Sequence, residues 1–334
     1  MHWLSVAANR LLWLIPTLIG LLAFVFVLSR IVPIDPAVLA AGENASPAQV
    51  EEVRERLGFD QPLPLQFVRY LADVVRGDLG TSLYTQQPIA GDLLARLPAT
   101  VELALVSVLI AALVGIPLGV ICGLHGNSWL DHGLRLLTVA SIALTHFWIA
   151  IQFQLFFSMN LGWLPLSGRI DGFPPPPVTG LYIVDALAAG DGAAFGSALA
   201  HIALPALTLG LPAAATVQRF TRNSIINVIA LPSVVYQTAM GLPRRVIVWK
   251  YLLRMSLAAT VTLLGLTAGI LLTGAVAVET VFDWPGLGSY AVRSILHSDY
   301  NAIMGFTLLT GGLFAILNVL VDMLQAAIDP RGAA

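Results

Sequence analysis

The chain has 334 residues, of which 57% are hydrophobic and only 11% are charged, and its mean hydropathy is +0.83. A soluble domain carries charge on about a quarter of its residues, so this composition excludes an ordinary soluble protein and predicts an integral membrane protein. The formal net charge of −2 says little, because acidic and basic residues are segregated along the chain.

Six long apolar stretches define the predicted fold. A helix crosses the hydrocarbon core of a bilayer in about 20 residues, and each stretch is free of Asp, Glu, Lys and Arg over roughly that length. They are 11–29, 103–130, 136–168, 192–218, 255–278 and 300–321. We expect an all-α integral membrane fold with six transmembrane helices. The first stretch is longer than the apolar region of a secretory signal and no clear cleavage site follows, so we count it as a span.

One basic segment sets the predicted topology. Residues 221–255 contain four arginines and one lysine but no carboxylate, and short loops rich in basic residues stay on the cytoplasmic side. By alternation, both termini are cytoplasmic and the segments 31–98, 161–198 and 279–299 face outward. A seventh charge-free interval, 223–243, has basic residues on both sides, so we expect it to lie at the cytoplasmic surface as short helices.

The chain divides into three predicted regions. Residues 1–30 form the N-terminus and first transmembrane helix, 31–98 form an extracytoplasmic segment, and 99–334 form the transmembrane core, which includes the basic loop 221–255. In the outer segment, Ser46 to Gln49 has the spacing of a capping box, and 65–75 is amphipathic. At the second span we place Glu102 in the first turn, where a carboxylate favours the helix dipole.

Several kinds of chemistry are absent from the sequence. It has no HExxH or GxSxG pattern, and Lys250 is the only lysine, so no GxxxxGK phosphate loop exists. We therefore expect no enzymatic activity and no ATPase site in this chain. His146 is the one ionisable residue well inside a span. It either lines a path or is a neutral imidazole bonded to a neighbouring helix.

A series of motifs follows in order along nearly the whole chain. They are GDLGTS at 77–82, RLPAT at 96–100, GIPLGV at 115–120, LPAL at 204–207, ETVF at 279–282, WPGLG at 284–288 and DPR at 329–331. In this order and spacing, they resemble the B-type permease subunit of bacterial dipeptide and oligopeptide importers of the ATP-binding cassette class. The resemblance implies a type I importer-like permease domain with an outward N-terminal insertion.

The resemblance also implies a coupling helix between the fourth and fifth spans, which inserts into a groove on an ATPase. Ala239, Gly241 and Leu242 fit the family signature, and Arg244 and Arg245 follow it. These five residues are the predicted ATPase-coupling residues.

The coupling signature departs from the family elsewhere. Pro232, Ser233, Tyr236, Thr238 and Met240 stand where family members usually have Asp, Tyr, Thr, Arg and Lys. One hypothesis is that a paired permease subunit supplies the firmer contact with the ATPase.

A second set of candidates belongs to the outer mouth or gate. Glu279, Trp284, Pro285 and Gly286 follow the predicted fifth span, and Asp299 directly precedes the sixth. Two other interpretations stay open. The Trp-Pro-Gly sequence is also a turn that ends a span, and Glu279 is also suited to local capping or to pairing with Arg293.

The resemblance implies a set of partners. These are a second homologous permease, one or two cytoplasmic ATP-binding subunits that hold ATP and magnesium, an extracytoplasmic substrate-binding protein and the lipid bilayer. We expect no nucleic-acid partner, and no cofactor or metal in this chain. The implied protein is a multi-pass permease of the bacterial cytoplasmic membrane that imports short peptides. The alternatives are import of nickel or another small ligand and, in another class, an ATP-independent secondary carrier.

Overall fold

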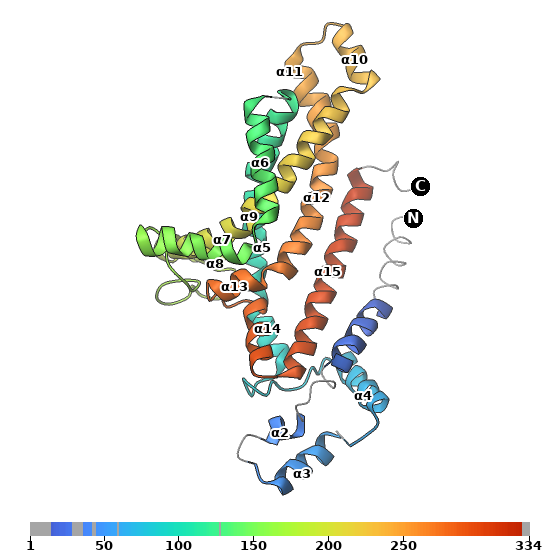
Figure 1. The fold of residues 1–334 in the computed structure, drawn as a ribbon, viewed down its shortest axis with the longest axis vertical. Coiled ribbons are helices and arrows are strands. Elements are labelled where there is room, and N and C mark those ends of the chain that lie inside the picture. Colours follow the sequence, from blue (N-terminus) through green and yellow to red (C-terminus); the bar gives the residue numbers. More distant parts are fainter. Residues whose placement is uncertain (1–14, 29–35, 42–44, 59, 127, 329–334) are drawn as a thin grey trace.

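The computed structural model describes residues 15–28, 36–41, 45–58, 60–126 and 128–328, and these ranges are mostly helical (Figure 1). A single antiparallel bridge joins Thr81 to Pro88. The labelled helices are α2 Pro36–Ala41, α3 Pro47–Leu57, α4 Leu63–Val75, α5 Ile89–Leu124, α6 Trp129–Ala143, α7 His146–Phe153, η1 Gln154–Asn160, α8 Tyr182–Ala189, α9 Gly192–Ile229, α10 Pro232–Ala239, α11 Arg244–Val246, η2 Ile247–Leu252, α12 Leu253–Gly274, α13 Val276–Val281, α14 Leu287–Leu296 and α15 Tyr300–Ile328. The prediction of an all-α fold is confirmed.

Within the described ranges, four helices are long and apolar enough to cross a membrane: Ile89–Leu124, Gly192–Ile229, Arg244–Gly274 and Tyr300–Met323. A bent pair, Asp131–Ser141 with His146–Asn160, makes a fifth if it is counted as one span. Helix Ile15–Leu28 is apolar but shorter, and the predicted first span begins at residue 11, outside the described residues. The prediction of several membrane spans is therefore confirmed, but helix length and composition give four or five rather than six.

The predicted third span, 136–168, is wrong as a single helix. α6 ends at Ala143, and the axis of His146–Asn160 turns by 103° from that of Asp131–Ser141. Leu144 and Thr145 between them are extended, with ψ of 131° and 141°, and an extended residue interrupts the helical hydrogen-bond ladder. Apolar residues continue on both sides of this break, so composition alone conceals it.

His146 lies at the start of α7, next to this bend, and its side chain is exposed. No described residue forms a hydrogen bond with the His146 imidazole. The interpretation of a ring bonded to a neighbouring helix therefore has no support, and the path-lining role stays a prediction.

α5 and α9 pack with their backbones in close approach. Gly115, Gly119 and Gly123 repeat every four residues along one face of α5. A methyl group placed on Gly119 would lie 2.8 Å from the Gln218 carbonyl oxygen and 2.6 Å from Thr221 Cβ. Glycine lets two membrane helices come this close, which increases dispersion contacts where water provides no driving force.

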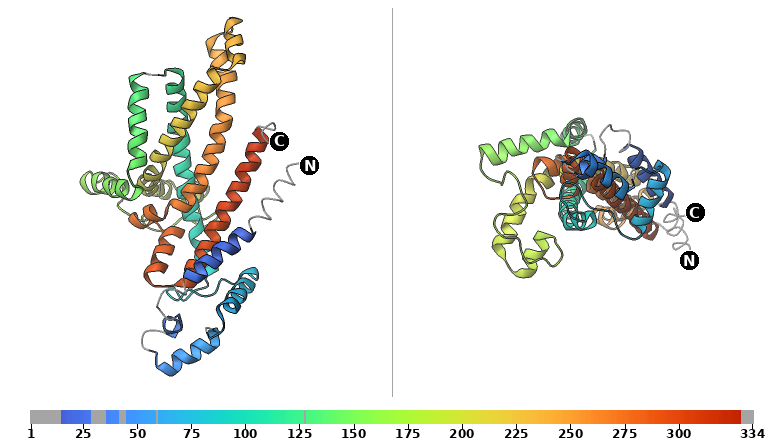
Figure 2. Two further views of the ribbon diagram at one scale, coloured as in Figure 1. Left: turned by 45° about the vertical axis from the view of Figure 1, so that its right-hand side comes forward. Right: turned by 90° about the horizontal axis from the view of Figure 1, so that it is seen from below.

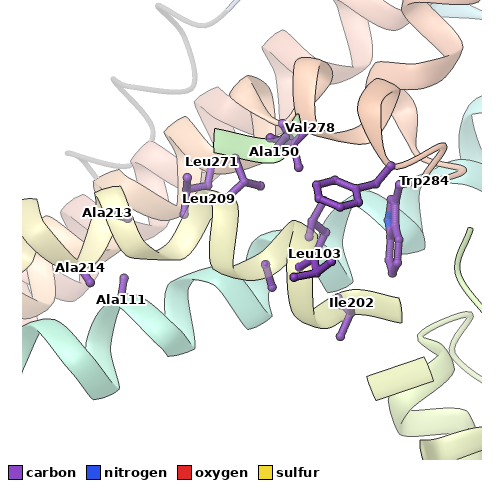
Figure 3. Packing of buried hydrophobic residues seen from close by; sticks show 14 of the residues in the cluster. Leu103, Ala111, Ala150, Ile202, Leu209, Ala213, Ala214, Leu271, Val278 and Trp284 are labelled. Carbon is purple, nitrogen blue, oxygen red and sulfur yellow. The ribbon is translucent and has the colours of Figure 1, made fainter. Parts of the chain in front are cut away.

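Toward the ends of these two helices that lie away from α10, the packing becomes a core of larger side chains. Leu103 of α5, Ile202 of α9, Val278 of α13 and Trp284 belong to one buried cluster. In Figure 3, Val278 and Trp284 lie above Leu103 and Ile202. Leu103, Ile202, Val278 and Trp284 are each at most 1% exposed. α13 and the turn after it are therefore fixed against the α5–α9 pair.

The two ends of the bundle differ in charge and in structure. α10 and α11 project at one end, and α2, α3 and α4 lie at the opposite end (Figure 1). The basic loop and the acidic N-terminal insertion are thus separated along the long axis, as the predicted topology requires. The α7 and η1 segment extends sideways from the long helices, as both views in Figure 2 show. The sequence-based division into regions 1–30, 31–98 and 99–334 stays a prediction.

The insertion contains the predicted capping box. The Gln49 backbone N–H donates to Ser46 Oγ, with 3.4 Å between the heavy atoms, and the Ser46 N–H donates to Gln49 Oε1 at 2.8 Å. Gly58 ends α3 in the left-handed conformation, with φ of 70°. α4 confirms the predicted amphipathic helix, and its Phe67 ring lies 5.3 Å from the ring of Phe26.

We expect Gly119→Ala to destabilise the chain because its methyl group would overlap α9, and overpacking of this kind costs about 1–3 kcal/mol. Thermal unfolding of the purified chain in detergent measures the effect. Gly133→Ala is the matched control, since no atom lies within 4 Å of the added methyl group and alanine is the better helix former. Equal melting temperatures for the two variants would contradict close α5–α9 packing.

Candidate functional site

The candidate coupling surface is the projecting end formed by residues 231–252. α9 runs without a break to Ile229, so the first part of the interval 223–243 continues this long helix instead of forming the predicted short helices. The later part does form a short helix. The chain is extended at Leu231, and α10 begins with Pro232 at its first position, where the missing N–H of proline costs nothing.

One side of this surface packs onto the membrane helices. Val228 of α9, Val234 of α10, and Ile247 and Leu252 of η2 form a small buried cluster, and Leu124 at the end of α5 packs against it. Burial of these side chains removes apolar area from water. The short helices are therefore held to the ends of α5 and α9.

The other side of the surface is open. The five predicted coupling residues, Ala239, Gly241, Leu242, Arg244 and Arg245, are all exposed. Gly241 has φ of +76°, a conformation that costs other residues about 1–2 kcal/mol, and it reverses the chain between α10 and α11. Their coupling role stays a prediction, and the structure places them together on one exposed turn.

Large apolar side chains surround this turn. Tyr236 is 65% exposed, Met240 is 66% exposed and Trp249 is 75% exposed. Tyr, Trp, Met and Arg are the residue types enriched in protein–protein interfaces. Residues 236, 238 and 240, which depart from the family signature, therefore still present a surface suited to a protein partner.

A buried ion-pair network lies just before this surface, and sequence reasoning missed it. Asp131 of α6 is fully buried and accepts hydrogen bonds from Arg222 Nε at 2.5 Å and Nη2 at 2.9 Å, and from Arg135 Nη2 at 2.6 Å. Ser128 Oγ, the cap of α6, accepts from the Asp131 backbone N–H at 3.3 Å. Arg222 therefore does not contribute free positive charge to the basic segment, and α6 is tied to α9. The i,i+4 spacing of Asp131 and Arg135 was the available signal.

We expect Asp131→Asn to cost about 3–5 kcal/mol, because it leaves a mostly buried arginine without its counter-charge. Asp283→Asn is the control, since Asp283 and Arg293 form a surface pair in which both side chains are more than half exposed, and such pairs contribute about 0–1 kcal/mol. Thermal unfolding of both purified variants tests this. A similar loss in the two variants would show that the Asp131 network is not a stabilising contact.

At the other end of the bundle, Glu279 is fully buried and holds three segments together. Its Oε1 accepts from Thr100 Oγ1 of α5 at 2.7 Å, and its Oε2 accepts from the backbone N–H groups of Gly288 at 2.7 Å and Ser289 at 3.1 Å. Burial raises the pKa of the Glu279 carboxyl, and these hydrogen bonds oppose the rise. The predicted pairing with Arg293 is wrong, because Arg293 Nη2 donates to Asp283 at 2.7 Å.

Trp284 and Gly286 complete this contact. The Trp284 indole N–H donates to the Ala99 carbonyl of α5 at 2.9 Å, and Trp284 is 1% exposed. A methyl group on Gly286 would overlap the Glu279 carboxyl group, so glycine is required there. Pro285 is exposed. The WPG sequence is thus a turn, as one interpretation held, and it also binds α13 and α14 to α5. Its role as a gate stays a prediction.

Asp299 is also fully buried. Its carboxylate accepts from Ser82 Oγ at 2.6 Å, from the Tyr84 N–H at 3.2 Å and from the Ala302 N–H at 3.1 Å. It therefore caps the start of α15 and fixes the loop that precedes α5. All of these hydrogen bonds come from donors of the same chain. The predicted outer-mouth role of Asp299 stays a prediction.

Sequence reasoning missed a second buried ion pair and misplaced Glu102. α5 begins at Ile89, so Glu102 lies more than three turns into the helix and does not interact with its N-terminal dipole. Instead, it accepts from Arg169 Nη2 at 2.5 Å and from the Ile183 N–H at 2.8 Å. The Arg169 guanidinium lies 3.7 Å from the centre of the Tyr182 ring. The outer segment between η1 and α8 is thereby anchored to α5.

We expect Glu279→Ala to destabilise the chain, because the Thr100 hydroxyl and two backbone N–H groups lose their acceptor, and each buried group left unpaired costs about 1–3 kcal/mol. Glu279→Gln keeps an acceptor oxygen in the same place and should cost less. Thermal unfolding in detergent ranks the two variants, with Glu55→Ala on the exposed side of α3 as the control. If Glu279→Gln lowers the melting temperature as much as Glu279→Ala does, the charge of the carboxylate matters more than its hydrogen bonds.

Within the described ranges, no cluster of three His, Cys, Asp or Glu side chains is suited to hold a metal ion. The buried carboxylates of Asp131, Glu279 and Asp299 accept hydrogen bonds from donors of the same chain.

Comparison with known proteins identifies the class. The family described as binding-protein-dependent transport system inner membrane component matches residues 115–333, and the N-terminal family of such membrane components matches residues 4–104. The chain therefore belongs to the inner-membrane permease components of binding-protein-dependent transport systems. It is a multi-pass inner membrane protein and a transport subunit rather than an enzyme.

Curated relatives align over almost their full length. The chain is 41% identical over 333 residues to the probable D,D-dipeptide transport system permease protein DdpB of Escherichia coli (strain K12), covering 99% of this chain and 98% of the relative. It is 35% identical to the dipeptide transport system permease protein DppB of Alkalihalophilus pseudofirmus, covering 98% and 99%. It is 36% identical to the glutathione transport system permease protein GsiC of Pectobacterium atrosepticum, covering 96% of each.

Proposed function

We propose that this chain forms half of the translocation path of an ATP-driven importer of short peptides. The observation that carries the proposal is the exposed turn at Gly241, with its aromatic and basic side chains, held to the ends of α5 and α9. The names of the relatives support the substrate class, since they refer to D,D-dipeptides, dipeptides and glutathione. Import of nickel or another small ligand by the same architecture is the alternative for the cargo.

The proposed assembly has four kinds of component. A second homologous permease completes the path, one or two cytoplasmic ATPase subunits hold ATP and magnesium, and an extracytoplasmic binding protein delivers the cargo. The end that carries α10 and α11 faces the cytosol, as do both termini, and the insertion with α3 and α4 faces outward. The basic residues 244–254 support this orientation.

The proposed mechanism uses α9 as a rod. Its 38 residues correspond to about 57 Å at 1.5 Å per residue. When an ATPase displaces α10, the buried cluster around Val234 transmits the displacement to α9 and α5, and the Asp131–Arg222 contact moves α6 with them. At the far end, Glu279 and Trp284 tie α13 and α14 to α5. α9 is one continuous helix although Pro205 and Pro212 lie within it, so motion at the coupling surface reaches the far end through α9 itself.

The rival class, a secondary carrier, is less well supported. Such a carrier needs ionisable groups along its path that gain and lose ions or protons. In the part of the chain that the structure describes, the buried carboxylates of Glu102, Asp131, Asp185, Glu279 and Asp299 each accept hydrogen bonds from donors of the same chain. These carboxylates therefore hold segments of the chain together, which does not favour a role in binding and releasing coupling ions.

We expect Gly241→Val to reduce ATPase recovery with the purified permease and to reduce peptide uptake, because valine strains the left-handed turn. Tyr236→Ala should have a similar but smaller effect, because it removes an exposed aromatic without disturbing the fold. Pull-down of the co-expressed ATPase and uptake of a radiolabelled dipeptide measure both. Gly190→Val, which imposes the same strain at φ of +68° in the outer region, is the control for ATPase recovery.

Two outcomes would count against the proposal. Unchanged ATPase recovery and unchanged uptake in Gly241→Val would remove the coupling role of this turn. Uptake that persists in cells lacking every candidate ATPase subunit would favour the secondary carrier instead.

A further inference from the structure

A cavity of about 240 Å³ lies at the insertion end of the bundle, and neither the coupling surface nor the outer-end contacts use it. It is open on one side and is lined by α4, the turn at 78–80, the first turns of α15 and Phe26 of helix Ile15–Leu28. Pockets for drug-sized ligands measure about 300–1,000 Å³. This cavity therefore suits a smaller molecule.

Its polar lining comes mainly from one stripe of α4. Gln66, Arg69, Tyr70 and Asp73 line the cavity, and their spacing of three and four residues places them on one face of the helix. The Gln66 side-chain nitrogen donates to the Gln61 carbonyl at 2.8 Å, which fixes the amide. The stripe thus presents a cation, a hydroxyl and a carboxylate to the same space.

The charges of this stripe do not neutralise each other. Arg69 and Asp73 are four residues apart, the spacing at which helical ion pairs form, but no ion pair between them, or between Arg69 and any other described carboxylate, is present. Asp73 lies 3.7 Å from Arg76, and both side chains are more than half exposed. Asp78 also lines the cavity. Asp78 Oδ1 accepts from the Gly80 N–H at 2.8 Å, so each carboxylate on this wall has one neighbour of its own, whereas Arg69 has no carboxylate partner among the described residues.

One polar group of this stripe, the Tyr70 hydroxyl, is unpaired among the described residues. It is buried, and no described residue forms a hydrogen bond with it. Burial raises the pKa of Tyr70 to about 12, so the hydroxyl is neutral and able to donate. A buried polar group without a partner costs about 1–3 kcal/mol, and a ligand that accepts this hydrogen bond would recover that cost.

We propose that this cavity binds a small zwitterion. Arg69 and the Tyr70 hydroxyl hold the anionic group, and Asp73 and Asp78 hold the ammonium group. Two sources share this chemistry, a free dipeptide and the headgroup of phosphatidylethanolamine. Phe26, on the apolar helix Ile15–Leu28, places the cavity next to a membrane-associated segment, so both sources have access. The dipeptide as a source rests on the proposed function, but binding in this cavity requires neither an ATPase nor a second permease.

Binding of dialanine to the full chain, in nanodiscs made only of phosphatidylglycerol, tests the peptide source by isothermal titration. We expect saturable binding that Arg69→Gln weakens at least about tenfold, as loss of a charge-assisted hydrogen bond predicts, and that Tyr70→Phe weakens by a smaller factor. Arg56→Gln on the exposed side of α3, which does not line the cavity, is the matched control and should bind normally. Equal thermal unfolding of the variants confirms that each is folded.

Native mass spectrometry of the chain, purified from membranes that contain both phospholipids, tests the lipid source. Retention of phosphatidylethanolamine by the unmodified chain and by Arg56→Gln, but not by Arg69→Gln, would support the site with a lipid as its ligand. The proposal is overturned if neither dialanine nor phosphatidylethanolamine binds. It is also overturned if Arg56→Gln and Arg69→Gln lose binding to the same extent, because the cavity then makes no specific contribution.

Discussion

The close approach of α5 and α9 is the constraint on which the rest of the structure depends. Where Gly115, Gly119 and Gly123 face α9, a single added methyl group finds no room. Several other contacts are built on this pair: Glu279 and Trp284 bind to the first half of α5, Asp131 binds to the last part of α9, and the coupling surface packs on the ends of both. Two helices in backbone contact behave as one rigid body because interiors are close-packed.

Charge is used differently at the surface and inside. The exposed charges are segregated by end, with basic residues beside α10 and α11 and acidic ones in the insertion. The buried charges connect segments far apart in sequence, such as Glu102 with Arg169 and Asp131 with Arg222. A buried ion pair adds less stability than its Coulomb energy suggests, but breaking it is costly. These ion pairs therefore determine which segments pack together more than they add to the stability of the packed state.

Composition and local motifs predicted a large part of this fold. The all-α class, the capping box at Ser46, the amphipathic α4 and the long apolar helices follow from periodicity and hydropathy, which are local properties. The bend at Leu144 and Thr145 was not predictable this way, because apolar residues continue through it. The roles of Glu102 and Glu279 also depend on partners that lie 67 and 179 positions away in sequence. The candidate coupling residues were named from a resemblance, and the structure shows only that they share an exposed turn.

The Asp131 network has a consequence for how the chain is made. Arg222 follows Asp131 by 91 positions, so the carboxylate leaves the ribosome well before its main partner exists. A lone carboxylate near apolar lipid is costly, and Arg135 in the same helix supplies an interim counter-ion from the start. Arg135 is thus available as a counter-ion for Asp131 within α6 itself, before the residues of α9 that hold Arg222 have been synthesised.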